Sequence, residues 1–169
     1  MAIYMNSKRT VLITGCSSGF GKSTAAHFLA RDWNVIATMR STTGISCWSR
    51  PSTSRSRRSI SNAIAKGIDR FGKIDAVVNN AAIGLFGAHE VTSDEVIREV
   101  FETNTFGVMV VSRAISPHMR QRQSGTIINV TSSAGIAPMP LVAAYTARNT
   151  RLRVSRNRSR MSSGCSAFG

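Results

Sequence analysis

Three glycines near the start of the sequence have a spacing that suits phosphate binding. They form Thr14-Gly15-x-x-x-Gly19-x-Gly21, between a short apolar run and a stretch of helical periodicity at Ser23–Arg31. Glycine has no Cβ, so the backbone can approach a pyrophosphate, and the next helix offers N–H donors and positive potential. The turn predicts a dinucleotide site, although glycine turns also join strands to helices for steric reasons alone.

The segment after the second apolar run carries a basic residue, Arg40, at the place where NAD sites usually carry an acidic residue. An acidic residue at that place binds the ribose hydroxyls of NAD. Here the segment reads Ala37-Thr38-Met39-Arg40 and contains no acid. Arg40 either pairs with a 2′-phosphate, which favours NADP over NAD, or is a surface arginine after a strand. The residues alone leave both interpretations open.

Side chains suited to carbonyl chemistry follow two later apolar runs. Asn79 and Ala81 lie at the end of one run, where polar groups face the ligand crevice of a parallel sheet. Ser132 ends another run, and Tyr145 comes thirteen residues later. A phenol can exchange a proton with a carbonyl or alcohol oxygen, and a hydroxyl can polarise that oxygen. Each feature is weak alone, because Asn-rich turns, serines and tyrosines are common.

The elements that must position these side chains alternate along the sequence. Nearly continuous apolar runs predict strands at Thr10–Thr14, Asn34–Thr38, Ile74–Asn79 and Gly125–Thr131. Helical periodicity covers Ser23–Arg31, Ile60–Phe71, a long stretch from the capping-box pair Thr92 and Glu95 to Ile115, and a start at Ala143–Ala147. This alternation indicates an α/β fold with a Rossmann-like, doubly wound parallel sheet that is covered on both faces.

Taken together, the motifs resemble the short-chain dehydrogenase/reductase family over Thr10–Ala147, apart from residues 41–59. Thr14–Gly21 is similar to its T-G-x-x-x-G-x-G, and Asn79–Ala82 to its N-N-A-G, with alanine as the last residue. Residues 127–135 are similar to the strand that delivers a catalytic serine. The resemblance implies an oxidoreductase that transfers hydride between a nicotinamide cofactor and a carbonyl or secondary alcohol.

The resemblance also implies roles for individual residues. Tyr145 is the proton donor and acceptor, Ser132 positions the substrate oxygen, and Asn104 holds a water in the proton relay. The residues expected at the cofactor are Thr14, Gly15, Ser17, Gly19, Phe20, Gly21, Arg40, Asn79 and Ala81. NADP(H) is the preferred cofactor, NAD(H) is the alternative, the partner is a small-molecule carbonyl or alcohol, and no metal is expected.

One position departs from the family pattern at the centre of the chemistry. The family tyrosine lies in Y-x-x-x-K, whereas the fourth residue after Tyr145 is Asn149. An isolated phenol has a pKa of about 10 and is a poor base at neutral pH. Arg148 lies one position off, about 100° around a helix, and does not readily release a proton. The alternative is therefore a catalytically inactive dinucleotide-binding remnant.

The net charge of +14 comes largely from two acid-free, Ser-rich windows. Residues 41–59 hold four arginines and residues 148–169 hold six, and without them the chain carries 12 basic and 8 acidic residues, a net +4. Arg/Ser runs are typical of nucleic-acid tails or of solvated, disordered segments. Because neither window interleaves aromatic residues in the manner of a stacking platform, we do not expect nucleic acid as a partner.

A shifted reading frame is the preferred hypothesis for both windows. Permitted codons for Arg148–Ser155, shifted after restoring one base, read Ser-Lys-His-Ala-Leu-Glu-Gly-Phe. This places a lysine four residues after Tyr145, in register with the family motif. A similar shift across Ser52–Arg55 recovers a Leu-Asp-Val-Thr strand end. The nucleotide sequence of the gene tests this hypothesis directly.

The expected organisation is a dinucleotide-binding domain over 1–147, with an aberrant basic insert or loop at 41–59 and a basic tail at 148–169. The resemblance implies that the sheet is C-terminally incomplete, because the family continues for roughly a hundred further residues that include its oligomer interface. Three cysteines without metal-ligand spacing and no apolar span of about 20 residues indicate a soluble, cytoplasmic protein.

Overall fold

The strands form one parallel sheet in the order β3-β2-β1-β4-β5. The computed structural model describes residues 8–39, 49–51, 57–137, 141 and 145–147. The strands are β1 (Thr10–Thr14), β2 (Asn34–Met39), β3 (Ser49–Pro51), β4 (Ala76–Asn79) and β5 (Thr126–Asn129). The helices are α1 (Gly19–Leu29), α2 (Arg57–Phe71), α3 (Asp94–Phe101) and α4 (Gly107–Gln121), with short turns η1 (His89–Val91), η2 (Glu102–Phe106) and η3 (Ser133–Gly135). The predicted Rossmann-like α/β fold is confirmed.

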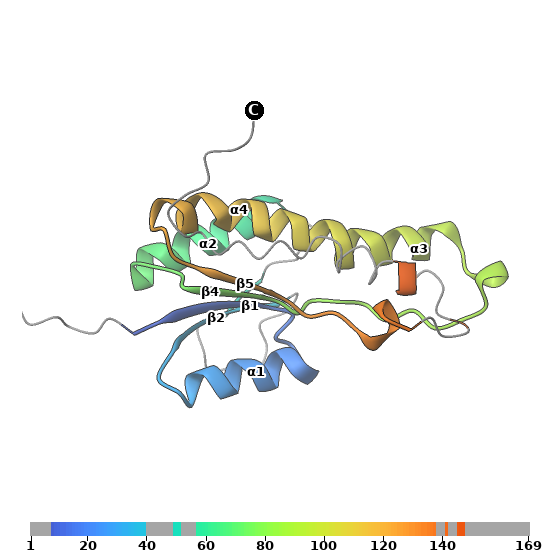
Figure 1. Ribbon diagram of the computed structural model, residues 1–169, viewed down its shortest axis with the longest axis horizontal. Coiled ribbons are helices and arrows are strands. Elements are labelled where there is room, and N and C mark those ends of the chain that lie inside the picture. Colours follow the sequence, from blue (N-terminus) through green and yellow to red (C-terminus); the bar gives the residue numbers. More distant parts are fainter. Residues whose placement is uncertain (1–7, 40–48, 52–56, 138–140, 142–144, 148–169) are drawn as a thin grey trace, which may run out of the picture.

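The sheet lies between two layers of helices, with α1 on one face and α2 and α4 on the other (Figure 1). Alternate residues of each inner strand point to opposite faces. Val11 and Ile13 pack toward α1 with Ala25, whereas Leu12 packs toward α2 and α4 with Ile115. Both faces of β1 are therefore buried, which explains why its three central residues, Val11–Ile13, are all apolar.

β1 is the central strand and has a parallel partner on each side. Thr10 pairs with Asn34 of β2, and Val11 pairs with Ala76 of β4. All five residues of β1 are buried. The carboxyl ends of β1 and β4 consequently lie side by side, and the loops that follow them meet at one edge of the sheet.

β5 differs from the inner strands because it lies at the edge of the sheet. It pairs with β4 from Ala76↔Thr126 to Asn79↔Asn129. Ile127 and Ile128 are 36% and 43% exposed. The side chains of β5 are therefore less covered than those of β1, and among the described strands β5 has β4 alone as a neighbour.

Two predicted boundaries also change. Residues 41–59, expected as an insert or loop, include β3, which pairs with the end of β2, and the first turn of α2. Thr92 does not cap the third helix: Ser93 is the N-cap residue, and the Thr92 hydroxyl donates to the carbonyl of Ala88. Backbone pairing with β2 explains the strand at Ser49–Pro51, and the local turn at Thr92 explains why the helix begins one residue later.

The long helical stretch is one continuous run with a wider turn in its middle. α3 ends at Phe101, a π-helical turn covers Glu102–Phe106, and α4 follows from Gly107. A π-turn inserts an extra residue into the hydrogen-bond ladder and re-aims the side chains within it. Thr103, Asn104 and Thr105 are all buried there. Among the described helices, none has the length and apolarity needed to cross a membrane.

A polar cluster joins the end of α4 to the start of β4. Arg122 donates to the Asp75 carboxylate over 2.9 Å and to the carbonyl of Ile74 over 3.0 Å. Asp75 also accepts from the backbone N–H of Thr10. The Nε2 atom of His118 accepts from the N–H of Ile74 over 3.2 Å. This cluster closes the end of the sheet opposite to the glycine turn.

The His118 contact predicts a pH dependence of stability. Burial, together with the Arg122 charge, lowers the pKa of His118, and Asp75 opposes this in part. The unfolded chain therefore binds a proton near pH 6.5 that the folded chain resists, so the stabilisation is full above this pH and declines as the pH falls through the folded pKa. We expect only a modest loss of stability, because solvent screens the partly exposed imidazole.

Urea unfolding between pH 7.5 and pH 5 measures this dependence. The variant His118→Gln should flatten it, whereas His89→Gln, on an exposed turn, should keep the wild-type profile. If the unfolding free energy of His118→Gln depended on pH in the same way as that of the wild type, His118 would not be the source of the pH dependence.

Candidate active site

Hydrogen bonds from Thr14 and Asn80 join the loops that follow β1 and β4. The Thr14 hydroxyl accepts the backbone N–H groups of Asn80 and Ala81, each over 3.0 Å. The Asn80 side chain donates to the carbonyls of Thr14 and Gly15 over 3.0 and 3.2 Å. Thr14 is 5% exposed, and its hydroxyl joins the two loops. The expected place of Thr14 at the cofactor stays a prediction.

The glycine turn forms a cradle that side chains would fill. A Cβ on Gly15 would lie 2.7 Å from the Cα of Ala81, and a Cβ on Gly21 would overlap the carbonyl oxygen of Gly15. Gly19 has φ +55 and faces open space. Gly15 and Gly21 thus permit close backbone packing, and Gly19 leaves a clear approach. This geometry fits the pyrophosphate of a dinucleotide.

The N-terminus of α1 faces this open approach. The hydroxyl of Ser18, the N-cap residue, makes no capping hydrogen bond within the described part of the chain. Ser17 is exposed, and Phe20 is 83% exposed. The first-turn N–H groups and the positive end of the helix dipole are therefore available to an anionic group.

Asn79 lies within the sheet rather than in the open crevice. It is 3% exposed, and its Nδ2 donates to the Oδ1 of Asn129 over 2.8 Å. The contact links the ends of β4 and β5. The Oδ1 atom of Asn79 has no hydrogen-bond partner among the described residues, and the expected role of Asn79 at the cofactor stays a prediction. Its neighbour Asn80 makes the contacts to the glycine turn instead.

Ser132 caps the short turn η3, just after the end of β5. Its Oγ accepts the backbone N–H of Ala134 over 3.2 Å. This bond orients the hydroxyl and uses it as an acceptor, so the hydroxyl proton remains to be donated. Ser132 is half-buried, whereas Ser133 is exposed and belongs to the turn itself.

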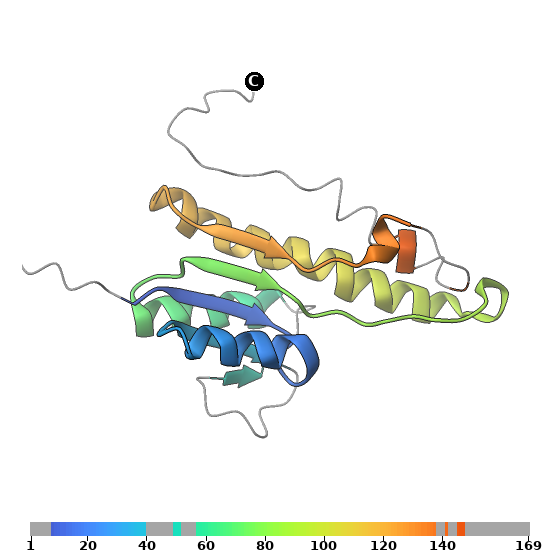
Figure 2. The ribbon, with the colours of Figure 1, turned by 60° about the horizontal axis from the view of Figure 1, so that its bottom comes forward.

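Of the other predicted residues, the structure describes some and not others. Tyr145 is half-buried in a helical segment over 145–147. The ribbons in Figures 1 and 2 both place this segment beside η3, the turn capped by Ser132. Arg40, expected at the 2′-phosphate, and Asn149 lie outside the described residues. The structure thus brings the serine and tyrosine segments together at one end of the sheet.

Asn104 clamps the loop after β4 to the π-turn. Its Oδ1 accepts the N–H of Ile83 over 2.8 Å, and its Nδ2 donates to the carbonyl of Ile83 over 2.7 Å. Asn104 is 0% exposed. The π-turn explains this geometry, because it turns an asparagine out of the ladder toward a neighbouring loop. The expected role of Asn104 in a proton relay stays a prediction.

Loss of this clamp should destabilise the fold strongly. Asn104→Ala removes two hydrogen bonds and leaves the Ile83 backbone groups without these partners, which costs about 2–4 kcal/mol. Ser116→Ala is the matched control, because the Ser116 hydroxyl only donates to the carbonyl of Ser112 on its own helix. Chemical denaturation measures both variants. Equal losses of unfolding free energy in the two variants would show that the contact of Asn104 with Ile83 stabilises the fold no more than the Ser116 hydrogen bond does.

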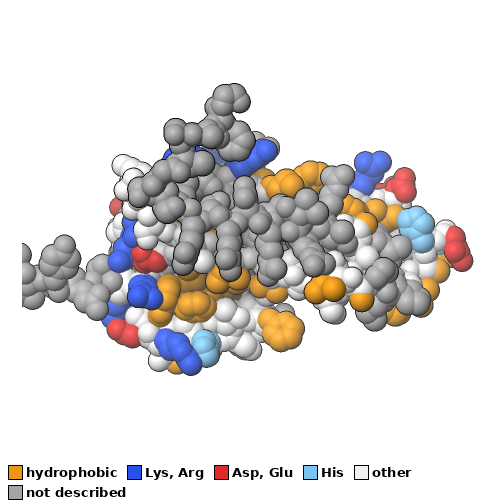
Figure 3. Space-filling model, viewed as in Figure 1, with side chains coloured by type: hydrophobic (Ala, Val, Ile, Leu, Met, Phe, Trp, Pro, Cys, Tyr) orange, Lys and Arg blue, Asp and Glu red, His pale blue; other side chains and the backbone are white. Residues whose placement is uncertain are grey.

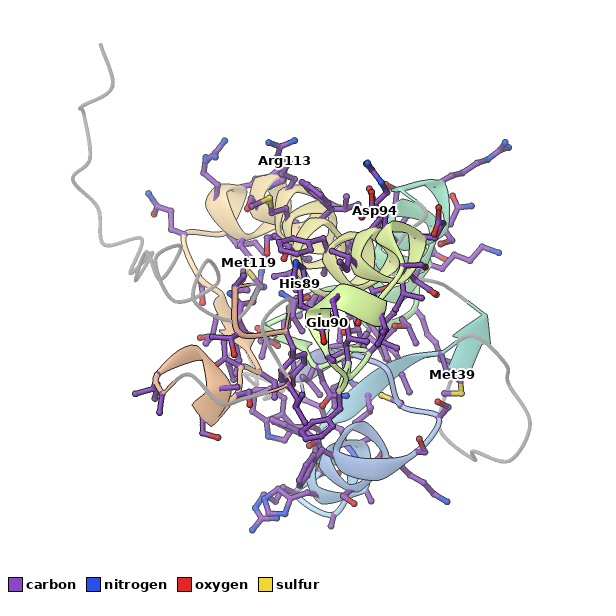
Figure 4. The ribbon with its side chains drawn as sticks, turned by 90° about the vertical axis from the view of Figure 1, so that its right-hand side faces the viewer. Met39, His89, Glu90, Asp94, Arg113 and Met119 are labelled. Carbon is purple, nitrogen blue, oxygen red and sulfur yellow. The ribbon has the colours of Figure 1, made fainter. Side chains whose placement is uncertain are left out.

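The candidate site extends across the carboxyl ends of the strands. Figure 4 faces this end of the molecule and shows Met39, at the end of β2, well apart from His89 and Glu90 of η1. Figure 3 shows hydrophobic side chains exposed at the same end, to the right of the view.

Three positioning contacts were not recognised from the sequence. Asn80 sits beside Asn79 in the same motif, and only strand alternation separates a buried side chain from one facing the loop. Asn129 was visible as a polar residue in an apolar strand. The contact of Asn104 with Ile83 required the π-turn, for which the helical periodicity gave no signal.

Comparison with known proteins places this geometry in a family. A family model described as short chain dehydrogenase matches residues 9–149. The chain is 35% identical over 139 residues to a 3-ketodihydrosphingosine reductase from Bacteroides thetaiotaomicron, covering 81% of this chain and 52% of the relative. The chain thus spans about half the length of this curated relative.

Solved structures agree with the assignment. A short-chain dehydrogenase from Streptomyces avermitilis superposes with a TM-score of 0.83 at 31% identity, covering 88% of this chain and 58% of that one. A 3-ketoacyl-(acyl-carrier-protein) reductase from Brucella melitensis, solved with NADH, gives 0.81 at 26% identity over 87% and 66%. The glycine cradle, the serine turn and the family match together show that the chain belongs to the short-chain dehydrogenase family of oxidoreductases.

Proposed function

We propose that the chain binds NADP(H) in preference to NAD(H) and transfers hydride between the nicotinamide and a small carbonyl or secondary alcohol. The observation that carries the proposal is the glycine cradle, which opens at the N-terminus of α1 and is held by Thr14 and Asn80 against the loop after β4. Arg40, which follows β2, supports the preference for a 2′-phosphate.

The chain's own residues supply binding and proton chemistry. The bound cofactor supplies the hydride donor or acceptor at its nicotinamide ring. Ser132 holds the substrate oxygen with the hydroxyl proton that its contact with Ala134 leaves available. Tyr145 transfers a proton to or from that same oxygen. Asn104 and Asn79 keep the loops in place from buried positions.

A second candidate function is dinucleotide binding without turnover. Asn149 stands where the family motif has lysine, and this substitution favours the second candidate. A lysine beside a phenol stabilises its ionised form by charge and thereby makes it a better base. Binding without turnover therefore follows if the proton step depends on that cation.

Titration of the 169-residue chain with NADPH and NADH tests the proposed cofactor. We expect at least tenfold tighter binding of NADPH, because a charge-assisted contact to a phosphate is worth about 1.5–3 kcal/mol. Arg40→Ser should remove the preference and leave the NADH affinity unchanged. Equal affinities in the wild type would refute the preference, and binding of neither dinucleotide would refute the function.

Turnover is tested with NADPH and a panel of ketones and quinones, followed by the loss of absorbance of the reduced nicotinamide. Oxidation that depends on the ketone supports the reductase, and tight binding without oxidation supports the second candidate. Retention on nucleic acid that salt weakens and that deletion of residues 148–169 abolishes would instead favour a polyanion-binding tail.

A further inference from the structure

The backbone of β5 forms an open edge of the sheet among the described residues, where β4 is its one strand neighbour. Figure 2 shows β5, in orange, as the outermost strand on its side of the sheet. The N–H of Thr126 donates to the carbonyl of Asp75, and the N–H of Val130 donates to the carbonyl of Asn79, each over 3.0 Å. Backbone groups alternate along a paired strand, so the N–H and C=O groups of Ile127 and Asn129 point to the open side.

Exposed apolar side chains flank this edge on both faces of the sheet. Ile128 pairs with Val78, which belongs to the core cluster on the α1 side, so Ile128 and Val130 lie on that face. They are 43% and 41% exposed, and Ile127, on the opposite face, is 36% exposed. The strand Thr126–Asn129 contains neither a charged residue nor a proline, the residues that commonly protect edge strands from pairing.

The distribution of charge indicates what this edge can pair with. The chain carries a net charge of +14, so two copies repel each other wherever their charged segments meet. Residues 123–147, which include β5, contain no charged residue. The edge therefore offers no charge to attract an acidic peptide or a nucleic acid, whereas a second copy can approach it without bringing like charges together.

We propose that β5 pairs antiparallel with β5 of a second copy, about a two-fold axis at Ile128. In this register Ile127 lies opposite Asn129 of the second copy, and the two residues exchange both of their N–H to C=O hydrogen bonds. The symmetric pair does the same. Ile128 meets its own copy in a non-hydrogen-bonded pair, in which the side chains approach closely. Five strands from each copy then form one continuous sheet.

Sedimentation velocity of the 169-residue chain, after nuclease treatment, measures this association. We expect a monomer–dimer equilibrium that shifts toward the dimer as the salt concentration rises, because salt screens the repulsion between two basic chains. A chain that stays monomeric at all concentrations overturns the proposal. A dimer that salt dissociates also overturns it, since ion pairs would then hold the two copies together.

A matched pair of variants at Ile127 tests the backbone pairing. Ile127→Pro removes one outward N–H from each copy and leaves the ladder to β4 intact, because that N–H points away from β4. Ile127→Val keeps the donor. The proline should weaken dimerisation roughly tenfold or more, since two hydrogen bonds are lost, and the valine should change it by less than about twofold. A folded proline variant, checked by circular dichroism, that dimerises like the wild type overturns the proposal.

A charge at the axis gives an independent reading if the proline variant does not fold. Ile128→Lys places two ammonium groups opposite each other across the axis, and we expect a monomer. Val96→Lys is the control, because Val96 is 41% exposed and lies on α3, away from this edge. A dimer that Val96→Lys dissociates and Ile128→Lys does not would place the interface on the helices and overturn the proposal.

Disulfide trapping tests the register. Cα atoms in a non-hydrogen-bonded antiparallel pair lie about 4.5 Å apart, within the range that a disulfide spans. In a Cys47→Ser, Cys165→Ser background, which keeps the buried Cys16, oxidation should cross-link Ile128→Cys and leave Val96→Cys uncoupled. Equal cross-linking of the two variants overturns the register. Dinucleotide binding is measured separately, so the loss of either property leaves the other standing.

Discussion

Replacing Gly21 with alanine is expected to abolish dinucleotide binding and to destabilise the folded chain by about 3 kcal/mol or more. An added Cβ would overlap the carbonyl oxygen of Gly15 and lie 2.5 Å from the Nδ2 of Asn80. Neither group can move freely, because Asn80 also donates to the Thr14 and Gly15 carbonyls. The substitution therefore forces apart the two loops that form the cradle.

Gly84→Ala provides the matched control. Its added Cβ meets no atom within 4 Å, and Gly84 lies in the loop after β4. This variant should keep wild-type stability and NADPH affinity within twofold. Thermal unfolding and fluorescence titration measure the two quantities separately. Wild-type NADPH affinity in Gly21→Ala would show that the glycine turn is not where the dinucleotide binds.

Restoring the family lysine should produce the largest gain in activity. Asn149→Lys recreates Y-x-x-x-K with Tyr145 as the first residue. An ammonium group beside a phenol favours its ionised form, and general acid–base catalysis contributes about 10²–10⁴-fold to a rate. We expect kcat for ketone reduction to rise at least tenfold, with less change in KM, because the lysine acts on the proton step.

The double variant Asn149→Lys, Tyr145→Phe is the control for this gain. It removes the phenolic hydroxyl and should return turnover to background while NADPH still binds. Asn149→Gln, which changes the side chain without adding a charge, should remain at the wild-type rate. A gain that survives the loss of the tyrosine hydroxyl would assign the effect of the lysine to cofactor binding instead.

The inner sheet was predictable because its strands carry a continuous apolar signal. β1 and β4 are buried on both faces, so their consecutive residues Val11–Ile13 and Ala76–Val78 are all apolar. β3 has no such signal: Ser49–Pro51 is polar and short, and it is a strand because β2 offers a free edge for backbone pairing. Secondary structure that depends on a neighbouring backbone leaves little trace in the side-chain pattern.

The candidate site was predictable as a set of motifs but not as a set of contacts. The glycine spacing identified the cradle, since a missing Cβ is visible in the sequence. The sequence did not show that Asn79 contacts Asn129 whereas Asn80 contacts the glycine turn, because two adjacent asparagines have identical chemistry and differ only in the face they occupy. The roles of Arg40 and Asn149 stay predictions, because both lie outside the described residues.

The central position of β1 constrains the order in which the chain can fold during synthesis. Its first partner, Asn34 of β2, is 24 residues from Thr10, whereas Ala76 of β4 is 65 residues from Val11. Closing the shorter loop costs less chain entropy, and local contacts form faster. A β1–α1–β2 unit should therefore form on the ribosome first and remain open along one edge of β1 until β4 emerges.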